Sequence, residues 1–209
     1  MFAAGMSTRT KQSLLRLSQA SFIDRFYLAG GTAVALHLGH RLSFDLDFFS
    51  SKAFAVEKIT QELQLLGKLT IMQKEPTTLL GTFQGTKVSF FYLTHPLIGR
   101  TEKYLDITIA SPKDLIAMKL MAIAQRGTKR DFIDLYMLLH RKYSLKQCLS
   151  FLKQKYSRDE FSLTHIIRSL TYFEDADEDK SELQLLQPIN WTQVKNYFST
   201  AAPKLIDQL

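Results

Sequence analysis

The sequence lacks most features that mark secreted, membrane or zinc-binding proteins. Its 209 residues contain one cysteine, Cys148, which excludes an internal disulfide framework and is typical of a reducing cytoplasm. No apolar run reaches the length of about 18 residues that a membrane span needs, and the N-terminus lacks the apolar stretch of a signal peptide. The five histidines show no metal-binding spacing. We therefore expect a cytoplasmic protein with Cys148 as a small buried residue.

The composition is that of an ordinary globular protein with an excess of basic over acidic residues. Hydrophobic residues make up 45% of the chain and charged residues 22%, and the formal net charge is +7. An excess of Lys and Arg favours an anionic partner such as a nucleotide or RNA. The acidic segment 174–182 (EDADEDKSE) makes the charge uneven, and we expect it to be a solvated loop.

The most informative stretch is 28–50, LAGGTAVALHLGHRLSFDLDFFS. A strand ending near Ala29 is followed by a Gly-Gly turn and a short helix that ends at Gly39. The next residues alternate as in a strand, with one face formed by Phe44, Leu46 and Phe48 and the other by Ser43, Asp45 and Asp47. Two carboxylates next to each other on one strand face repel each other, and a bound cation would offset this repulsion. Mg²⁺ is the natural candidate, because one or two carboxylates together with substrate phosphates usually hold it.

The residues before this strand are suited to binding an anion. Gly30, Gly31 and Thr32 lead directly into a helix, so backbone N–H groups and the positive end of the helix dipole would face a ligand. Arg41 would lie beside the acidic strand and could hold a triphosphate bidentately, and Ser43 shares the aspartate face. Together with Asp45 and Asp47, these residues predict a site for a metal–nucleoside triphosphate. His37 and His40 are expected at the surface or as caps.

The remaining pattern predicts an α+β protein: a mixed β-sheet core with flanking helices, followed by a helical C-terminal part. We expect domains at 1–110 and 111–209. The expected strands are 26–29, 43–49, 69–73, 78–83, 87–93 and 106–110. The expected helices are 8–20, 33–38, 56–66, 111–125, 128–140, 144–155, 158–172 and 191–208. Capping boxes are expected at Ser111 to Asp114 and at Thr128 to Asp131.

Lys119 is the one polar residue between Leu115 and Ala124. It must extend its amine to solvent or find an anion. If it binds phosphate, Lys119→Met should keep or raise thermal stability while nucleotide affinity falls. Asp131 and Asp134 are three residues apart on one helix face. A capping box explains Asp131, and Asp134 could pair with Arg130 at i, i+4.

The motifs GGT and GHRLSFDLDFF, with ASPKDLIAMKLMAIAQRGTKRDFIDLYMLL downstream, resemble the nucleotidyltransferase superfamily and its AbiEii/AbiGii-type toxin branch. The resemblance covers roughly residues 24–141. It implies that Lys119 contacts phosphate and that Asp131 and Asp134 take part in activity. Many members have a third carboxylate on a neighbouring strand, where this chain has Ser89.

The implied activity is Mg²⁺-dependent transfer of a nucleoside monophosphate from an NTP to an acceptor such as RNA or tRNA. The implied biological role is that of the toxin in a bacterial toxin–antitoxin or phage-defence pair, with a cognate antitoxin protein as partner. Two alternatives remain open: a non-catalytic nucleotide- or partner-binding module, and nucleotidylation of a protein. If turnover survives, Asp131 or Asp134 could replace the carboxylate missing at Ser89.

Overall fold

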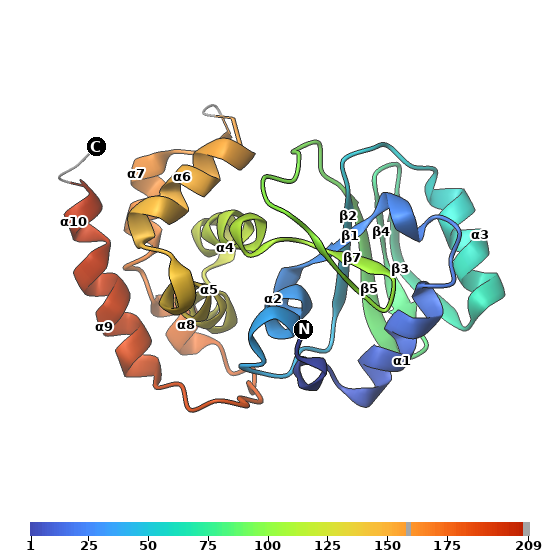
Figure 1. Cartoon of the computed structure of the whole chain (residues 1–209), viewed down its shortest axis with the longest axis horizontal. Coiled ribbons are helices and arrows are strands. Elements are labelled where there is room, and N and C mark those ends of the chain that lie inside the picture. The colour runs from blue at the N-terminus through green and yellow to red at the C-terminus, as the bar shows by residue number, and fades with distance from the viewer. Residues whose placement is uncertain (158–159, 207–209) are drawn as a thin grey trace.

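The computed structural model describes residues 1–157 and 160–206, and a seven-stranded mixed sheet forms its centre (Figure 1). The strand order is β3-β4-β5-β2-β1-β7-β6. Strands β1 and β7 pair in parallel, as do β2 and β5, and the other neighbouring pairs are antiparallel. The strands are β1 (Tyr27–Ala29), β2 (Leu46–Ser50), β3 (Leu69–Glu75), β4 (Thr78–Phe83), β5 (Thr86–Tyr92), β6 (Glu102–Tyr104) and β7 (Ile107–Ile109).

Helices cover both faces of the sheet (Figure 1). Helices α1 (Thr8–Leu17) and α3 (Val56–Leu66) lie on one side, and α2 (Gly30–Leu38) with the C-terminal helices lies on the other. The C-terminal helices are α4 (Pro112–Arg126), α5 (Lys129–Lys142), α6 (Leu145–Lys155), α7 (Leu163–Ser169), α8 (Glu174–Glu178), α9 (Trp191–Ala201) and α10 (Pro203–Ile206). None of the described helices is long and apolar enough to cross a membrane.

The two faces of β2 have different tasks. Leu46 and Phe48 point into the core beneath α1 and α3, where Phe48 stacks on Phe90 of β5 at 5.1 Å between ring centroids. Burying a phenylalanine of this kind contributes about 1.5–3 kcal/mol. Asp47 faces the opposite way, and its partner in the β2–β5 register is Ser89. The sheet thus fixes Asp47 on a rigid surface that α4 covers.

Helix α4 begins as its sequence predicts. The Ser111 hydroxyl accepts a hydrogen bond from the Asp114 N–H, and Pro112 occupies the first turn. The Asp114 carboxylate then accepts bonds from the N–H groups of Ile98 and Gly99 and pairs with Lys155 at 2.9 Å. The helix ends at Gly127, whose φ of +52° is left-handed. Both ends of the helix that carries Lys119 are therefore held in place.

The α+β class is confirmed, and several boundaries differ from prediction. Strand β2 begins at Leu46, so Phe44 is 45% exposed instead of buried. Strand β6 was missed, and the acidic segment expected as a loop forms α8 over part of its length. The helix expected at 158–172 is α7, and residues 158–159 lie outside the described parts of the chain.

The change from strands to helices comes after β7, near the boundary expected at residue 110. The helix expected at 191–208 is divided into α9 and α10, and its last two residues lie outside the described part. Cys148 is fully buried, as expected. Helix α2 packs against both α4 and α5, so the sheet part and the helical part share an interface. The division into two domains stays a prediction.

Candidate active site

Asp45 and Asp47 line one pocket at the start of β2. Asp47 lies between Ala29 of β1 and Ser89 of β5 in the strand register, and the Ser89 side chain acts to lower the pKa of the Asp47 carboxyl. Asp45 immediately precedes the strand and is half-buried, like Asp47. The two predicted carboxylates are therefore together, and Ser89 occupies the neighbouring-strand position expected for it.

The electrostatics of the pair favour a bound cation. Burial raises the pKa of Asp47, and Asp45 raises it further, although Ser89, Lys119 and Arg126 act in the opposite direction. Two carboxylates beside an open pocket fit Mg²⁺, which takes its other ligands from water and substrate phosphates. Within the described residues no group of three or more His, Cys, Asp or Glu side chains could hold a metal ion. A metal here would thus depend on the bound nucleotide for its remaining ligands.

Gly30 and Gly31 leave room for the side chains of the site. Gly30 has a φ of +64°, and a Cβ there would collide with the carboxylate of Asp47. A Cβ at Gly31 would collide with the guanidinium of Arg41. In the described structure no side chain caps the N-terminus of α2, which leaves its N–H groups available to an anion. Phosphate binding by these glycines stays a prediction.

Thr32 and Ser43 support the acidic strand from behind. The Thr32 hydroxyl bonds the Ser43 hydroxyl at 2.8 Å and donates to the carbonyl oxygen of Asp45. Thr32 is buried, and its hydroxyl is engaged in holding the segment before β2. Ser43 is also buried, but it lines the pocket. Both residues were predicted to bind nucleotide; Ser43 reaches the pocket, and Thr32 holds Asp45 by a hydrogen bond to the Asp45 carbonyl.

Three cations surround two buried aspartates beside the acidic pair. Lys119 Nζ lies 2.8 Å from Asp131 Oδ1 and 2.6 Å from Asp134 Oδ2. Arg41 binds Asp134 through Nε at 2.7 Å and Nη2 at 2.8 Å. Arg126 binds Asp131 through Nε at 2.9 Å. With three positive and two negative groups, this cluster keeps one positive charge in excess.

The two aspartates act as anchors for these cations. Burial by itself would raise the pKa of Asp131, but Lys119 and Arg126 outweigh it and hold the pKa well below its usual range. For Asp134, Arg41 and Lys119 likewise overcome burial and lower the pKa strongly. Both side chains are completely buried and paired with cations, and the expectation that either carboxylate replaces the one missing at position 89 stays a prediction. In this geometry the two aspartates hold Lys119, Arg41 and Arg126 in place through ion pairs.

Several local interpretations of these residues were wrong. The Thr128 side chain does not cap α5; its hydroxyl donates instead to the Asp131 carboxylate at 2.6 Å. Asp134 pairs with Lys119 and Arg41 in place of Arg130. His40 is fully buried, and its Nε2 lies 2.8 Å from Asp134 Oδ1. Asp134 and His40 were interpreted from neighbours in the sequence, whereas their partners come from other elements.

Two neighbouring cavities share Asp47 in their lining. The smaller, about 180 Å³, lies between Asp45, Arg41 and Lys119, and the larger, about 550 Å³, extends between the sheet and α4. The apolar lining of the larger cavity consists mainly of Phe49, Leu80, Phe91, Leu93, Leu115, Met118, Met121 and Ala122. Both cavities are lined by Asp47, Lys87, Lys119 and Arg126. The acidic pair is thus placed where a polar pocket meets an apolar cleft.

Two parts of the site were not predicted from the sequence. Lys87 is exposed on β5 and points to the same face as Ser89, two residues later, so strand alternation could have found it. The segment 181–184 lines the smaller cavity and brings Glu182 to it. Backbone bonds hold this segment, from Leu42 N–H to Gln184 O and from Leu186 N–H to His40 O, at 2.8 and 2.9 Å. No periodicity in the sequence could indicate such a long-range contact.

The profile of one protein family, "Nucleotidyl transferase AbiEii toxin, Type IV TA system", matches residues 12–94 and 84–208. The chain belongs to this family. The match confirms the family expected from the motifs and extends it to the C-terminal helices. This AbiEii-family chain is also 36% identical over 202 residues to an uncharacterised protein of Aquifex aeolicus, covering 94% of this chain and 96% of the relative.

Solved structures share the fold of this AbiEii-family protein. JHP933 from Helicobacter pylori superposes with a TM-score of 0.56 at 19% identity, covering 98% of this chain and 94% of that one. MenT4, a nucleotidyltransferase toxin from Mycobacterium tuberculosis, has a TM-score of 0.56 at 14% identity over 94% of this chain and 86% of that one. Family and fold together confirm that the protein is a nucleotidyltransferase.

Proposed function

We propose that this AbiEii-family protein transfers a nucleoside monophosphate from an NTP to a hydroxyl group of RNA, such as the end of a tRNA. The hydroxyl oxygen forms a bond to the α-phosphorus, and the bond from that phosphorus to the bridging oxygen breaks, which releases pyrophosphate. One observation carries the proposal: Asp45 and Asp47 lie beside the cation cluster, where a polar pocket adjoins an apolar cleft. Such a site can bind the charged and apolar ends of one nucleotide.

The cations of the pocket would bind and orient the triphosphate. Lys119 and Arg41 are nearly buried and held by aspartates, so they are fixed before the substrate arrives. Arg126 is 56% exposed, and Lys87 is exposed on the facing strand, so both can reach phosphate oxygens directly. Positioning and charge stabilisation account for most of the catalysis of phosphoryl transfer. The N–H groups at the start of α2, in Gly30 and Gly31, would add donors.

The acidic pair and the apolar cleft would complete the substrate site. Asp45 and Asp47 would hold Mg²⁺, which supplies positive charge to neutralise the phosphates and to align the attack. The rings of Phe49 and Phe91 lie in the larger cavity, where they can contact a nucleobase or ribose. This cavity, about 550 Å³, has the volume of a typical small-molecule site.

The RNA acceptor and the biological role are supported by charge and family. A net charge of +7 favours a polyanion over a neutral acceptor. The family description names a toxin of a type IV toxin–antitoxin system. We therefore propose that the protein is the toxin of a bacterial toxin–antitoxin or phage-defence pair, that it acts in the cytoplasm, and that a cognate antitoxin protein opposes its action.

Transfer can be tested with radiolabelled NTPs, Mg²⁺, total RNA and a protein extract, followed by separation of RNA from protein. We expect label in RNA with the natural protein and none with Asp47→Asn. Asp24→Asn removes the same charge at an exposed position and should label RNA normally. Label in protein alone would refute the RNA acceptor, and unchanged labelling with Asp47→Asn would refute the site.

A second candidate function is favoured by Ser89. A serine cannot bind a metal or accept a proton as a carboxylate does, and the expected substitutes, Asp131 and Asp134, are buried and paired with cations. The chain would then be a non-catalytic nucleotide-binding module of the same fold. Mg²⁺-dependent NTP binding by calorimetry, without transfer to RNA or protein, would support this alternative.

A further inference from the structure

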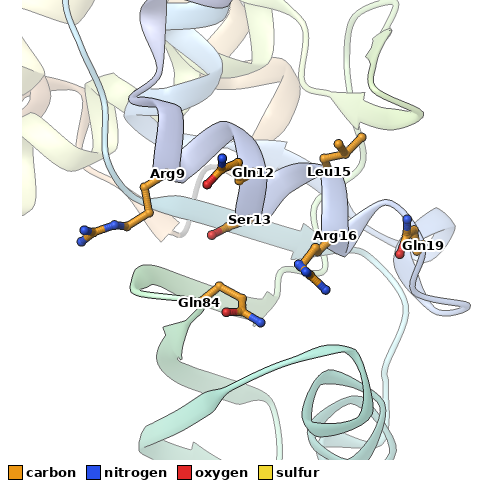
Figure 2. Close-up of a pocket in the computed structure, with 7 residues that line it drawn as sticks. All are labelled: Arg9, Gln12, Ser13, Leu15, Arg16, Gln19 and Gln84. Atoms are coloured by element: carbon orange, nitrogen blue, oxygen red, sulfur yellow. The ribbon is translucent and has the colours of Figure 1, made fainter.

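A groove of about 580 Å³ follows α1 on the side of the sheet opposite α4. Figure 2 shows Arg9, Ser13 and Arg16 along the helix side that faces Gln84 of the β4–β5 turn. The residues that line the groove are Arg9, Gln12, Ser13, Leu15, Arg16, Gln19 and Gln84. Two guanidinium groups and three primary amides thus surround one hollow.

The helix is fixed firmly against the turn. The Ser13 hydroxyl donates to Thr86 Oγ1 at 2.8 Å, and it also lies 3.3 Å from the carbonyl oxygen of Phe83. Arg9 lies across Gly85, where an added Cβ would be 3.2 Å from Arg9 Cδ. The walls of the groove are therefore held by contacts between two separate elements, so its shape does not depend on a bound partner.

The positive charge of the groove is not neutralised within the protein. Among the described residues, no acidic side chain lines the groove or lies within ion-pair distance of Arg9 or Arg16. The first acidic residue of the chain is Asp24, which follows α1. Arg9 and Arg16 are seven residues apart on a helix, which separates their backbones by about 10.5 Å along its axis. This spacing suits two phosphates of one strand better than a single small anion.

Helix α1 also contacts the edge of the active site, at Phe44. Thr10 of α1 donates a hydrogen bond to the Phe44 carbonyl at 3.3 Å, and Phe44 lines the pocket that contains Asp45. The Phe44 ring is 45% exposed, although large aromatic side chains are usually well buried. Exposed aromatic rings combined with basic side chains are what proteins use to stack an unpaired base while its backbone is held.

We propose that the α1 groove binds the backbone of the acceptor RNA, and that Phe44 stacks a base near the end that enters the active site. This inference rests on the proposed transfer to RNA and adds the surface that would select it. Arg9 and Arg16 bind two phosphates, while the amides of Gln12, Gln19 and Gln84 donate to phosphate or sugar oxygens. A single strand is the fitting form, because its bases are free to stack.

The test is fluorescence anisotropy with a labelled single-stranded RNA of about 16 nucleotides, without NTP or Mg²⁺. Arg9→Gln/Arg16→Gln removes two charges from the groove. Lys146→Gln/Lys153→Gln is the matched control, because these exposed lysines are also seven residues apart on one helix, α6. Circular dichroism and thermal unfolding check that both variants fold, and calorimetry with Mg²⁺–NTP checks that the nucleotide site is intact.

We expect the groove variant to bind RNA more weakly and with less salt dependence. Two lost phosphate contacts lower the slope of log K against log salt by about 1.4 for a single strand. The natural protein should therefore lose about sevenfold more affinity than the variant between about 50 and 200 mM salt. Phe44→Ala should weaken RNA binding about fivefold or more without changing the salt slope.

Equal losses in the groove and control variants would overturn the proposal, because binding would then follow net charge alone. Equal competition by an acidic polypeptide or by DNA of the same sequence would also overturn it in favour of a different anionic partner. Failure of the proposed enzyme activity is distinguishable: RNA binding in the groove would persist while no label is transferred. Transfer to RNA with undiminished binding by the groove variant would refute the groove and keep the activity.

Discussion

Replacing Lys119 by methionine tests the electrostatic design of the site most directly. Lys119 is 5% exposed and lies 2.8 and 2.6 Å from the carboxylates of Asp131 and Asp134. The sequence alone suggested that methionine would keep or raise stability, because a buried charge would be exchanged for an apolar chain. The structure reverses this expectation, because the change leaves two buried carboxylates with one cation fewer.

The magnitude follows from the partners that remain. Removing one member of a buried ion pair costs about 3–5 kcal/mol, and we expect about 3 kcal/mol because Arg41 and Arg126 still neutralise the aspartates. That is a large part of the total stability of about 5–15 kcal/mol typical of folded proteins. In a chain of this length it should lower Tm by about 6–12 °C. NTP affinity should fall about tenfold or more, since charge-assisted hydrogen bonds contribute about 1.5–3 kcal/mol.

The assay combines thermal and urea unfolding with calorimetry of Mg²⁺–NTP binding. Lys146→Met, at an exposed position of α6, is the control and should change neither property. The double variant Lys119→Met/Asp131→Asn should lose less stability than the sum of the losses of the two single variants. In the double variant, the Asp131 carboxylate that would have lost its Lys119 partner is itself neutral. An unchanged or higher Tm for Lys119→Met would refute the reasoning.

Three further predictions follow from the same geometry. The pKa values of Asp131 and Asp134 are lower in the folded state than the value of about 3.9 in an unfolded chain, so these carboxylates stabilise the fold above about pH 3.9 and stabilise it less as the pH falls below that value. Urea unfolding between about pH 6 and 3 should show this decrease in the free energy of unfolding, and Asp131→Asn should make the decrease smaller. Gly30→Ala should lower stability by about 1–3 kcal/mol and reduce transfer, because φ is +64° and the new methyl group meets Asp47; normal unfolding and activity would contradict this. Ser89→Asp should strengthen Mg²⁺ binding and raise transfer, because it adds a carboxylate beside Asp47; weaker Mg²⁺ binding in calorimetry would argue against a metal there.

Local rules were sufficient for the elements that carry the site. Strand alternation placed Asp47 opposite Leu46 and Phe48, because side chains on a strand point alternately to its two faces. The Ser111 cap and the glycine at Gly127 predicted both ends of α4. The alternation failed at Phe44 because β2 begins only at Leu46, and a residue outside the ladder has no fixed face.

The sequence by itself determined the α+β class, the acidic pair and the family motifs, because each is expressed over a few neighbouring residues. Only the tertiary structure decided which anion Lys119 meets and what Asp131 and Asp134 do. Arg41 and Asp134 are 93 residues apart in the chain yet 2.7 Å apart in space. No local pattern reports such a contact, because it exists only once α2, α4 and α5 pack together. A carboxylate on a helix can bind a metal ion, cap the helix N-terminus or pair with a cationic side chain. For Asp131 and Asp134, the packing of α2, α4 and α5 selects the cationic side chains.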